Sequence, residues 1–440
     1  MELTEVVYTS LKKQEDCRQN ISLKDVVRES CGYKNYLRFI QEEPGKEARA
    51  EKILRDKIAA KFKGKVTEYL KDNYGDAFTP GGVGKLNDVV DVEITGFLGD
   101  YLVEVEVISA GAFDGSAAKG VVPLWARVTA ATKAHITKKK KVLLILVNRN
   151  NQNWCSFSIS GELSEIYREV SEDVEDLKAL IEGRGSHKGD ESSCSMCTYS
   201  KPCMADKQPK KAAYTASFLR VSPSADLCTQ LDQYLWSLNS RDSGRSNKCI
   251  HPSEFSISEC DRRIAYELLG VERKEAISAH LRRIFDYGHA CHDVIQETFK
   301  ESLGDRCEIE VPVRHEALKI KGSCDGVLDK VHGQEIKSIS SKGFEKLSSP
   351  KKEHQKQGTL YGFPLGLKDV TYLYVNKDTG SLQEYVVPVS KPLWHRMAAR
   401  AESILRELDR ESMPVRITKD YLCKSCPFTW KCRPELRRTG

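Results

Sequence analysis

Alternating apolar and polar positions predict paired strands in both halves of the chain. In the first half they cover residues 91–109 and 142–160, and in the second half residues 320–340 and 370–390. Within each segment an apolar run leads into a polar turn and then into a second apolar run, which is the pattern of a β-hairpin. The same arrangement of strands is therefore expected twice.

Helical periodicity follows the later hairpin of each half. Apolar residues recur every three to four positions over residues 162–181 and again over residues 392–411. The order of elements is thus repeated, with strands followed by a helix in each copy. The predicted fold class is α/β, in two tandem copies.

Cysteines repeat with the same period as the strands. Two C-x2-C-x5-C triplets occur, and each has a single cysteine 163 residues upstream. Every member of the first set has a counterpart 229 residues later, as Cys31 has in Cys260. The sets are Cys31, Cys194, Cys197 and Cys203, and Cys260, Cys423, Cys426 and Cys432. Clustered thiolates in a reducing compartment usually hold a metal.

The repeat predicts how the 440 residues divide into domains. We expect one domain at residues 1–203 and a second at 250–440. Residues 204–249, rich in Lys, Ser, Pro and Asp, are expected to form a packed linker with a short helix near 227–238. Two domains of about 200 residues each also suit a chain of this length.

Composition favours a soluble chain in the cytoplasm. No apolar run is long enough to cross a membrane, and the first five residues carry two acids where a secretory signal needs basic and apolar residues. In the cytoplasm the 15 cysteines are expected to be thiols rather than disulfides. A net charge of +6 is compatible with binding nucleic acid.

Four short motifs in the second half combine acidic, basic and histidine side chains. They are G-H-A-C-H ending at His292, G-S-C-D-G around Asp325, E-I-K from Glu335 to Lys337, and Q-G-T-L-Y from Gln357 to Tyr361. Each alone has an ordinary explanation, such as a solvated strand edge, a turn, a surface histidine or amphipathic packing. Their order and spacing together are much more specific.

The chemistry of these residues is that of metal-assisted phosphodiester hydrolysis. Glu335 and Lys337 are two apart on a predicted strand and share a face. The carboxylates of Glu335 and Asp325, the carbonyl of Ile336 and the imidazole of His292 form a ligand set for Mg²⁺ or Mn²⁺. Such an ion activates water, while Lys337 orients that water and stabilises charge on phosphorus.

A predicted helix supplies two further polar residues. Gln357 and Tyr361 are four apart and lie on one helix face, where they are expected to position the metal-bound water or the DNA backbone. His289 is an alternative to His292 as the nitrogen ligand, but a surface role fits it better.

In this order the motifs resemble those of the PD-(D/E)XK nuclease superfamily, in its RecB-like branch, which has G-x3-H, an aspartate, E-x-K and Q-x3-Y. The cysteines resemble the iron–sulfur subgroup, which includes CRISPR-adaptation, AddAB-type and exonuclease V nucleases. Arg262, Arg263 and Tyr266, which follow Cys260, are also typical of that subgroup. The resemblance covers nearly all of residues 250–433. It implies two restriction-endonuclease-like domains, each a mixed central sheet flanked by helices and stapled by a four-cysteine cluster.

The nature of the cysteine-bound metal depends on which argument is followed. Spacing alone favours zinc, because zinc sites built from four cysteines are common. The resemblance favours a [4Fe–4S] cluster on Cys260, Cys423, Cys426 and Cys432. By repetition, Cys31, Cys194, Cys197 and Cys203 are expected to hold a second cluster.

The first half lacks the motifs of the second. No histidine precedes His135, so a G-x3-H helix is not possible there. Residues 94–97 align with the motif aspartate and contain no carboxylate, and residues 122–134 contain no Q-x3-Y. We therefore expect a degenerate, pseudonuclease copy that serves as a scaffold or substrate platform.

Carboxylates do remain near the E-x-K position of the first half. Glu104 or Glu106 aligns with the motif glutamate, so that the lysine position falls on Glu106 or Ile108 and never on a lysine. An ion bound by these glutamates with Asp91 and Asp100 is one alternative, but we expect all four to be solvated strand edges.

The resemblance implies a metal-dependent DNA nuclease, with an exonuclease acting on single-stranded DNA or DNA ends as the expected form. No G-x4-G-K-[ST] motif is present, so unwinding requires a separate helicase, and a recombination or adaptation protein is a further possible partner. The alternative is a non-catalytic iron–sulfur protein that binds nucleic acid or organises an assembly. The intact set of His292, Asp325, Glu335 and Lys337 argues against that alternative.

Overall fold

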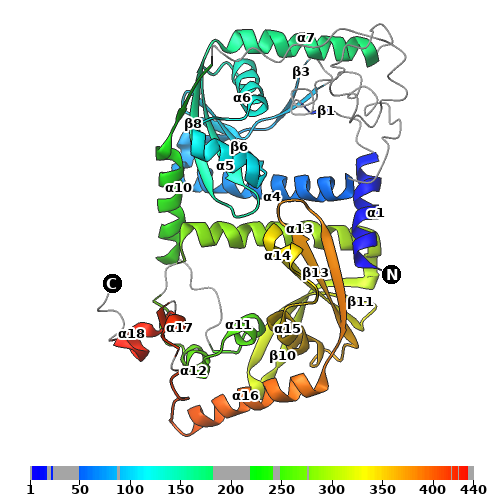
Figure 1. Cartoon of the computed structure of the whole chain (residues 1–440), viewed down its shortest axis with the longest axis vertical. Helices are drawn as coiled ribbons and strands as arrows, with labels where there is room; N and C mark the ends of the chain where they lie inside the picture. The colour runs from blue at the N-terminus through cyan, green and yellow to red at the C-terminus, as the bar shows by residue number, and fades with distance from the viewer. Residues whose placement is uncertain are drawn as a thin grey trace. The chain divides into compact units, whose positions relative to one another are not determined.

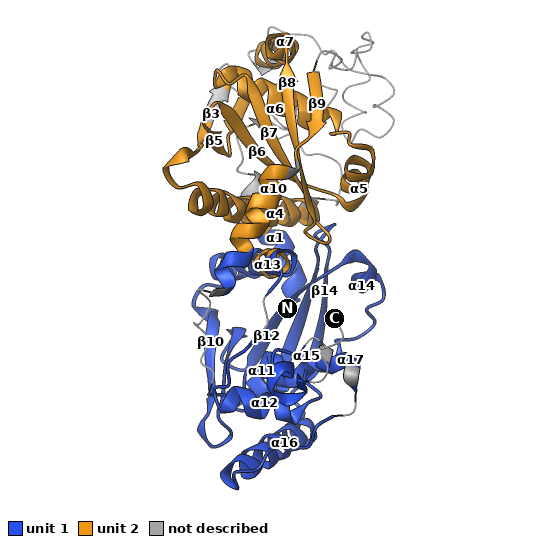
Figure 2. Cartoon of the chain, turned by 90° about the vertical axis from the view of Figure 1, so that its left-hand side faces the viewer, with its two compact units in different colours: residues 1–10, 236–282, 288–440 blue, residues 11–235, 283–287 orange. Residues whose placement is uncertain are grey.

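The computed structural model (Figure 1) describes residues 2–16, 21–22, 49–86, 90–181, 219–240, 248–274, 277–417, 419–424 and 426–434. Contacts divide the chain into two units, coloured separately in Figure 2: unit 1 is Met1–Ser10, Trp236–Arg282 and Gly288–Gly440, and unit 2 is Leu11–Leu235 and Arg283–Tyr287. Among the described helices, none combines the length and apolar character needed to cross a membrane.

Unit 2 is built on a six-stranded sheet in the order β2-β5-β6-β7-β8-β9. Its strands are β2 (Phe78–Pro80), β5 (Gly96–Leu98), β6 (Tyr101–Ile108), β7 (Lys141–Asn148), β8 (Trp154–Gly161) and β9 (Leu219–Pro223). β6 and β7 run parallel and the other neighbours antiparallel. A small second sheet joins β1 (Ile21–Ser22), β4 (Val90–Glu93) and β3 (Val83–Leu86).

Helices cover the six-stranded sheet because its central strands are apolar on both faces. They are α4 (Arg49–Tyr74), α5 (Ala110–Lys119), α6 (Leu124–Ile136), α7 (Leu163–Ile181) and α10 (Ala225–Ser237). Ile166, Val170, Val174 and Leu177 of α7 form a buried stripe at helical spacing, packed into the core with the apolar residues of β7. Residues 219–237, within the predicted linker, supply β9 and α10.

Unit 1 is built on a five-stranded sheet in the order β10-β11-β12-β13-β14. Its strands are β10 (Cys307–His315), β11 (Ile320–Leu328), β12 (His332–Ile339), β13 (Asp369–Asn376) and β14 (Leu382–Pro388). β12 and β13 are the parallel pair, and the other neighbours are antiparallel.

The helices of unit 1 include long amphipathic ones and short ones near the cysteines. They are α11 (Pro252–Ile257), α12 (Asp261–Leu268), α13 (Ala279–Leu303), α14 (Ser341–Glu345), α15 (Lys352–Gly362), α16 (Lys391–Asp409), α17 (Asp420–Lys424), α18 (Thr429–Cys432) and α1 (Leu3–Asp16). Residues 11–16 of α1 and 283–287 of α13 are assigned to unit 2. Hydroxyl caps begin α13 and α16: Ser278 accepts from Leu281 N–H, and Ser390 from Leu393 N–H.

The two sheets share their central design. Each has an antiparallel hairpin, a crossover through two helices to a parallel strand, and a further antiparallel hairpin. The last hairpin turns alike in both: Asn148 Oδ1 accepts from Asn150 N–H at 2.9 Å, and Asn376 Oδ1 accepts from Asp378 N–H at 3.0 Å. The predicted fold class, two α/β copies with mixed sheets flanked by helices, is confirmed.

Candidate active site

β11 and β12 bring the predicted acidic and basic residues to one place on the unit 1 sheet. Asp325 lies on β11, and Glu335 and Lys337 lie on β12. The strands pair antiparallel with Gly326 opposite Gln334, so Asp325 is beside the E-x-K segment. Glu335 and Lys337 share a face of the sheet because side chains alternate along a strand.

Polar contacts fix Asp325 against its neighbours. Ile336 N–H donates to Asp325 Oδ2 over 2.7 Å, and His292 Nδ1, on α13, lies 3.4 Å from Asp325 Oδ1. Gln296, one turn beyond His292, donates to the Asp325 carbonyl oxygen over 2.9 Å. Gln296 was not among the predicted site residues, although its four-residue spacing from His292 places both on one helix face.

Glu335 is 1% exposed, and its two carboxylate oxygens differ in their hydrogen-bond partners. The Lys337 ammonium donates to Oε1. Oε2 is buried and makes no hydrogen bond to any described residue. A buried carboxylate oxygen without a partner is unfavourable, so the site fits an additional cation at this atom.

Burial and neighbouring charges separate the pKa values of the two carboxyl groups. Burial raises the pKa of Glu335 to about 7, although Lys337 opposes the rise. Burial also favours neutral Asp325, but His292 and Lys337 outweigh it and lower the pKa of Asp325. Burial acts to lower the pKa of Lys337 and of His292, yet the carboxylates beside them raise both.

Helix α15 adds the predicted glutamine and tyrosine. Both are buried, and Gln357 Nε2 donates to the Tyr361 hydroxyl over 3.0 Å. Burial, and then the charge of Glu335, raise the pKa of Tyr361 well above its ordinary value, which keeps the phenol neutral. His289, the alternative nitrogen ligand, is exposed on α13.

These side chains are not arranged as a complete set of metal ligands. In the part of the chain that is described, no group of three or more His, Cys, Asp or Glu side chains has a metal-binding arrangement. Lys337 remains in contact with Glu335, and His292 remains in contact with Asp325. Binding an ion here would require these pairs to open or shift.

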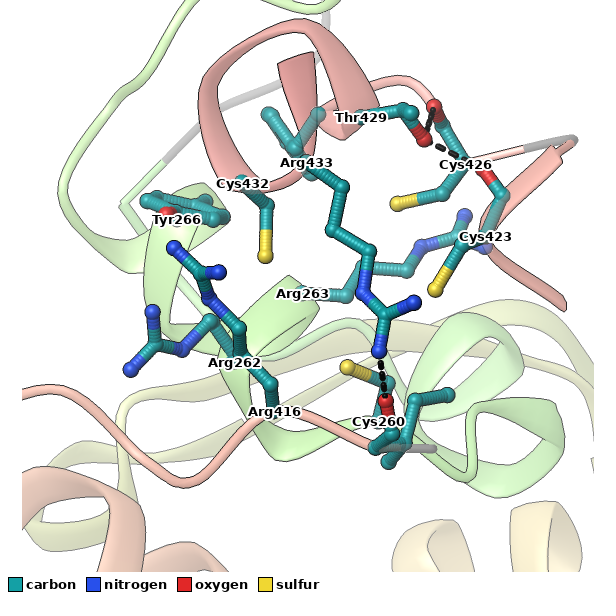
Figure 3. Close-up of a pocket in the computed structure, with 12 residues that line it drawn as sticks. Cys260, Arg262, Arg263, Tyr266, Arg416, Cys423, Cys426, Thr429, Cys432 and Arg433 are labelled. Atoms are coloured by element: carbon teal, nitrogen blue, oxygen red, sulfur yellow. Dashed lines mark hydrogen bonds between the residues drawn. The ribbon is translucent and has the colours of Figure 1, made fainter. Parts of the chain in front are cut away.

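The four cysteines of the second set line a single pocket (Figure 3). Cys260 precedes α12, while Cys423, Cys426 and Cys432 come from α17, α18 and the turn between them. Figure 3 shows their sulfur atoms facing the pocket from different sides. Thr429 anchors the turn, because its hydroxyl donates to the Cys426 carbonyl oxygen over 3.0 Å.

Arginines surround the same pocket, at positions 262, 263, 416 and 433. Arg262 Nε donates to the Pro414 carbonyl oxygen over 2.6 Å and Arg433 Nη2 to the Ile417 carbonyl oxygen over 2.8 Å. A metal centre held by four thiolates is anionic overall, so the guanidinium groups fit such a centre electrostatically. Cys31, Cys194, Cys197 and Cys203 all lie outside the described residues.

The hydrogen-bond register of the two sheets identifies which residues of the first half correspond to Glu335 and Lys337. Ile108 pairs with Asn148 as Ile339 pairs with Asn376, at the start of equivalent turns. Counting back along the strands puts Glu104 at the position of the motif glutamate and Glu106 at that of the lysine.

The aspartate position of the first half is Thr95. Val105 N–H donates to Thr95 Oγ1 over 3.3 Å, just as Ile336 N–H donates to Asp325. This agrees with the sequence alignment, which found no carboxylate there.

The expectation that Glu104 and Glu106 form a solvated strand edge is wrong. They are 1% and 7% exposed. Lys133 Nζ, from α6, donates to Glu104 Oε2 over 2.8 Å, and Lys63 Nζ, from α4, lies 3.9 Å from the same oxygen. The paired ammonium groups make the burial of Glu104 possible. Asp91 is half-buried, and Asp100 is exposed as expected.

Comparisons with known proteins give no family. No protein-family model matches the chain, and a search of curated proteins finds no match. Among solved structures, the chain is similar to the crystal structure of SSO0001, with 19% identity and a TM-score of 0.33 over 46% of this chain and 95% of that one.

It is also similar to an alkaline exonuclease, LHK-Exo, from Laribacter hongkongensis. That structure has 13% identity and a TM-score of 0.31, over 41% of this chain and 93% of the exonuclease. LHK-Exo in complex with dAMP has 16% identity and a TM-score of 0.31, over 38% of this chain and 90% of that one. Likeness at these values is too low to assign a function.

Proposed function

We propose that the second half of the chain is a metal-dependent nuclease that hydrolyses phosphodiester bonds in DNA. The observation that carries the proposal is the buried Glu335 carboxylate, whose Oε2 makes no hydrogen bond to a described residue. It lies in a cluster with Asp325, His292 and Lys337, which are the residue types that metal-assisted hydrolysis needs.

Mg²⁺ or Mn²⁺ would be held by Glu335, Asp325, His292 and the Ile336 carbonyl. When bound, the ion supplies a polarised phosphate and a water of lowered pKa. Lys337 is already beside Glu335, where its ammonium group can stabilise charge that develops on phosphorus. The Ile336 N–H and Gln296 hold Asp325 in position, where its carboxylate would be one of the groups that hold the ion.

Gln357 and Tyr361 complete the site as neutral hydrogen-bonding groups. Because both are buried and joined to each other, their orientation is fixed before substrate arrives. We propose that they position the attacking water or the DNA backbone.

The substrate that we propose is single-stranded DNA or a DNA end, cleaved exonucleolytically. This rests on the resemblance of the motifs and on the net charge of +6. A separate helicase or recombination or adaptation protein would supply unwound ends. The first half would act as a scaffold or substrate platform.

We further propose that Cys260, Cys423, Cys426 and Cys432 hold a [4Fe–4S] cluster. All four line one pocket with arginines around it, which supports a four-thiolate centre although the thiols are not in a metal-binding arrangement, and the resemblance favours iron–sulfur over zinc. Such a centre would link residues far apart in the sequence and so close a long loop. Brown, anaerobically purified protein with broad visible absorption is expected, whereas colourless protein containing zinc would contradict the cluster.

The activity is tested with two labelled single-stranded DNAs of the same sequence, one linear and one circular. Anaerobically purified protein should degrade the linear strand with Mn²⁺ and should stop when EDTA is added. The circle should survive if cleavage requires an end. Metal-independent binding without cleavage of either strand would contradict the nuclease and favour the non-catalytic nucleic-acid-binding protein.

A further inference from the structure

His354 is a polar residue beside the candidate site that the proposed mechanism does not use. It lies on α15, three residues before Gln357. On β13, Tyr374 pairs in register with Lys337 in the parallel ladder, so their side chains share a sheet face. His354 contacts Tyr374, with Nδ1 2.8 Å from the hydroxyl oxygen. The imidazole is therefore held on the Lys337 side of the sheet.

A chain of hydrogen bonds determines where the imidazole proton lies. Lys351 N–H donates to the Tyr374 hydroxyl oxygen over 3.1 Å. No other described residue accepts the hydroxyl proton of Tyr374, so we assign that proton to the contact with His354 and take Nδ1 as the acceptor. A neutral imidazole that accepts at Nδ1 carries its proton at Nε2.

The charge state of His354 agrees with this tautomer. Burial lowers the pKa of His354 to about 3, and the positive charges of Lys337 and Lys351 act in the same direction. The ring is neutral at physiological pH, and burial raises the pKa of its partner Tyr374 to about 12. His354 and Tyr374 are thus both uncharged, although the charges of Lys337 and Lys351 act on the imidazole.

Nε2 is the unused end of this pair. Within the described part of unit 1, no residue forms a hydrogen bond with it, and the side chain is half-buried. Lys351 and Lys352, at the start of α15, are exposed beside it. A protonated Nε2 cannot act as a base, and a neutral imidazole is too weak an acid to protonate a leaving group. Its remaining capacity is to donate a hydrogen bond.

We propose that His354 donates from Nε2–H to a non-bridging oxygen of a DNA phosphate next to the one that reacts. This role rests on the proposed nuclease function, because it requires a DNA strand at the Lys337 face. Tyr374 acts as a positioning residue that fixes the tautomer. A neutral donor recognises the phosphate without adding charge and without releasing a counterion.

The test measures binding of a fluorescent 12-nucleotide single strand in EDTA, so that cleavage does not interfere. His354→Leu removes the donor and should weaken binding roughly tenfold, the scale of a hydrogen bond to a charged group. His354→Gln keeps an N–H donor of similar reach and should bind within about threefold of the native chain. His395→Leu, at an exposed histidine of α16, is the matched control and should bind normally.

Salt dependence separates a neutral donor from a cation. If His354 is neutral, log Kd against log salt should have the same slope for His354→Leu as for the native chain. A slope lower by about 0.7 would show the loss of a cationic phosphate contact and would overturn the proposal.

A methylphosphonate placed at successive positions identifies the contacted phosphate. At one position, in the diastereomer whose methyl group replaces the contacted oxygen, the native chain and His354→Leu should bind with equal affinity, because the acceptor has been removed. A difference that persists at every position would mean that His354 acts through the fold, and equal binding on unmodified DNA would exclude the contact.

If the native chain cleaves DNA while His354→Leu binds normally, this inference alone fails. If His354 contributes to binding but no DNA is cleaved, the nuclease function alone fails.

Discussion

A buried glutamate lies at the same position of equivalent strands in the two halves of this chain, but the charged groups around it differ. Glu335 shares its surroundings with Asp325, His292 and one lysine, and its Oε2 makes no hydrogen bond to a described residue. Glu104 has Thr95 in place of the aspartate, a hydrogen bond from Lys133 at 2.8 Å and Lys63 at 3.9 Å.

The difference lies in the charged groups that surround the buried carboxylate. In the first half two ammonium groups belonging to the chain compensate the buried carboxylate. Burial acts to lower the pKa of Lys63, but Glu104, Glu106 and Glu93 outweigh it and raise that pKa. In the second half Asp325 and Glu335 supply two carboxylates, and one oxygen of Glu335 has no hydrogen-bond donor among the described residues. We infer that the lysines of the first site take the place that the proposed metal ion would have in the second.

The largest effect is expected at the aspartate position. Asp325→Asn removes one charge from the ligand set, and single-turnover cleavage in Mn²⁺ should fall by more than about 10³-fold, because the ion is bound poorly as well as misplaced. Thr95→Val, at the equivalent position of the first half, should cleave at the native rate. Native activity of Asp325→Asn would show that cleavage does not need this carboxylate and would contradict the proposed difference between the two halves.

The two lysines should differ in their effect on catalysis. Lys337→Met should slow single-turnover cleavage by the folded protein by roughly 10²–10³-fold, and it should also destabilise unit 1, because the buried Glu335 loses the ammonium group that compensates it. Lys133→Met should leave Glu104 buried with less compensation and destabilise unit 2 by about 3–5 kcal/mol. Thermal and denaturant unfolding, with cleavage of the folded fraction, distinguish them. A stable Lys133→Met protein that has lost cleavage would reverse the assignment.

Metal affinity should depend on pH in the second half alone. Because burial raises the pKa of Glu335 to about 7, the metal-free site holds a proton on this carboxyl below that pH. Mn²⁺ must displace this proton and also that of His292, whose pKa, despite burial, is raised by Asp325, so its apparent affinity should fall by at least about tenfold per pH unit below about 7. Titration calorimetry from pH 5.5 to 8 measures the dependence, and Asp325→Asn removes the signal. A flat profile for the native chain would contradict the proton displacement.

The iron content should show whether one or both cysteine sets hold a cluster. If both hold a [4Fe–4S] cluster, anaerobic protein contains about eight iron atoms, and Cys432→Ser should reduce this to about four and lower solubility. Cys228→Ser, at a buried cysteine outside both sets, is the control and should retain its iron. About four iron atoms in the native chain and none in Cys432→Ser would restrict the cluster to the second half.

Local patterns were sufficient for much of the fold. The hairpins, both long helices after them and the helix near residues 227–238 were predicted, because each depends on nearby residues; that last helix is α10. The E-x-K pair and Asp325 could also be placed together, since two-residue periodicity and adjacent strands determine which side chains meet.

Partners distant in the sequence could not be predicted in the same way. Lys133 lies 29 residues after Glu104 on another element, and no periodicity links them. Glu104 was therefore predicted to be a solvated edge, although it is buried against its lysines. The His354–Tyr374 contact was missed for the same reason, because it joins a helix to a strand across a sheet face.

The most direct test of the account replaces the two equivalent glutamates by the same residue. Glu335→Gln and Glu104→Gln keep the side-chain shape and remove one charge each, and both proteins should be compared at equal cluster content and saturating Mn²⁺. If the active site lies in the second half, single-turnover cleavage of end-labelled single-stranded DNA should fall at least about 10³-fold in Glu335→Gln and stay within about threefold in Glu104→Gln. Native cleavage by Glu335→Gln together with loss of cleavage in Glu104→Gln would place the active site in the first half and contradict the account.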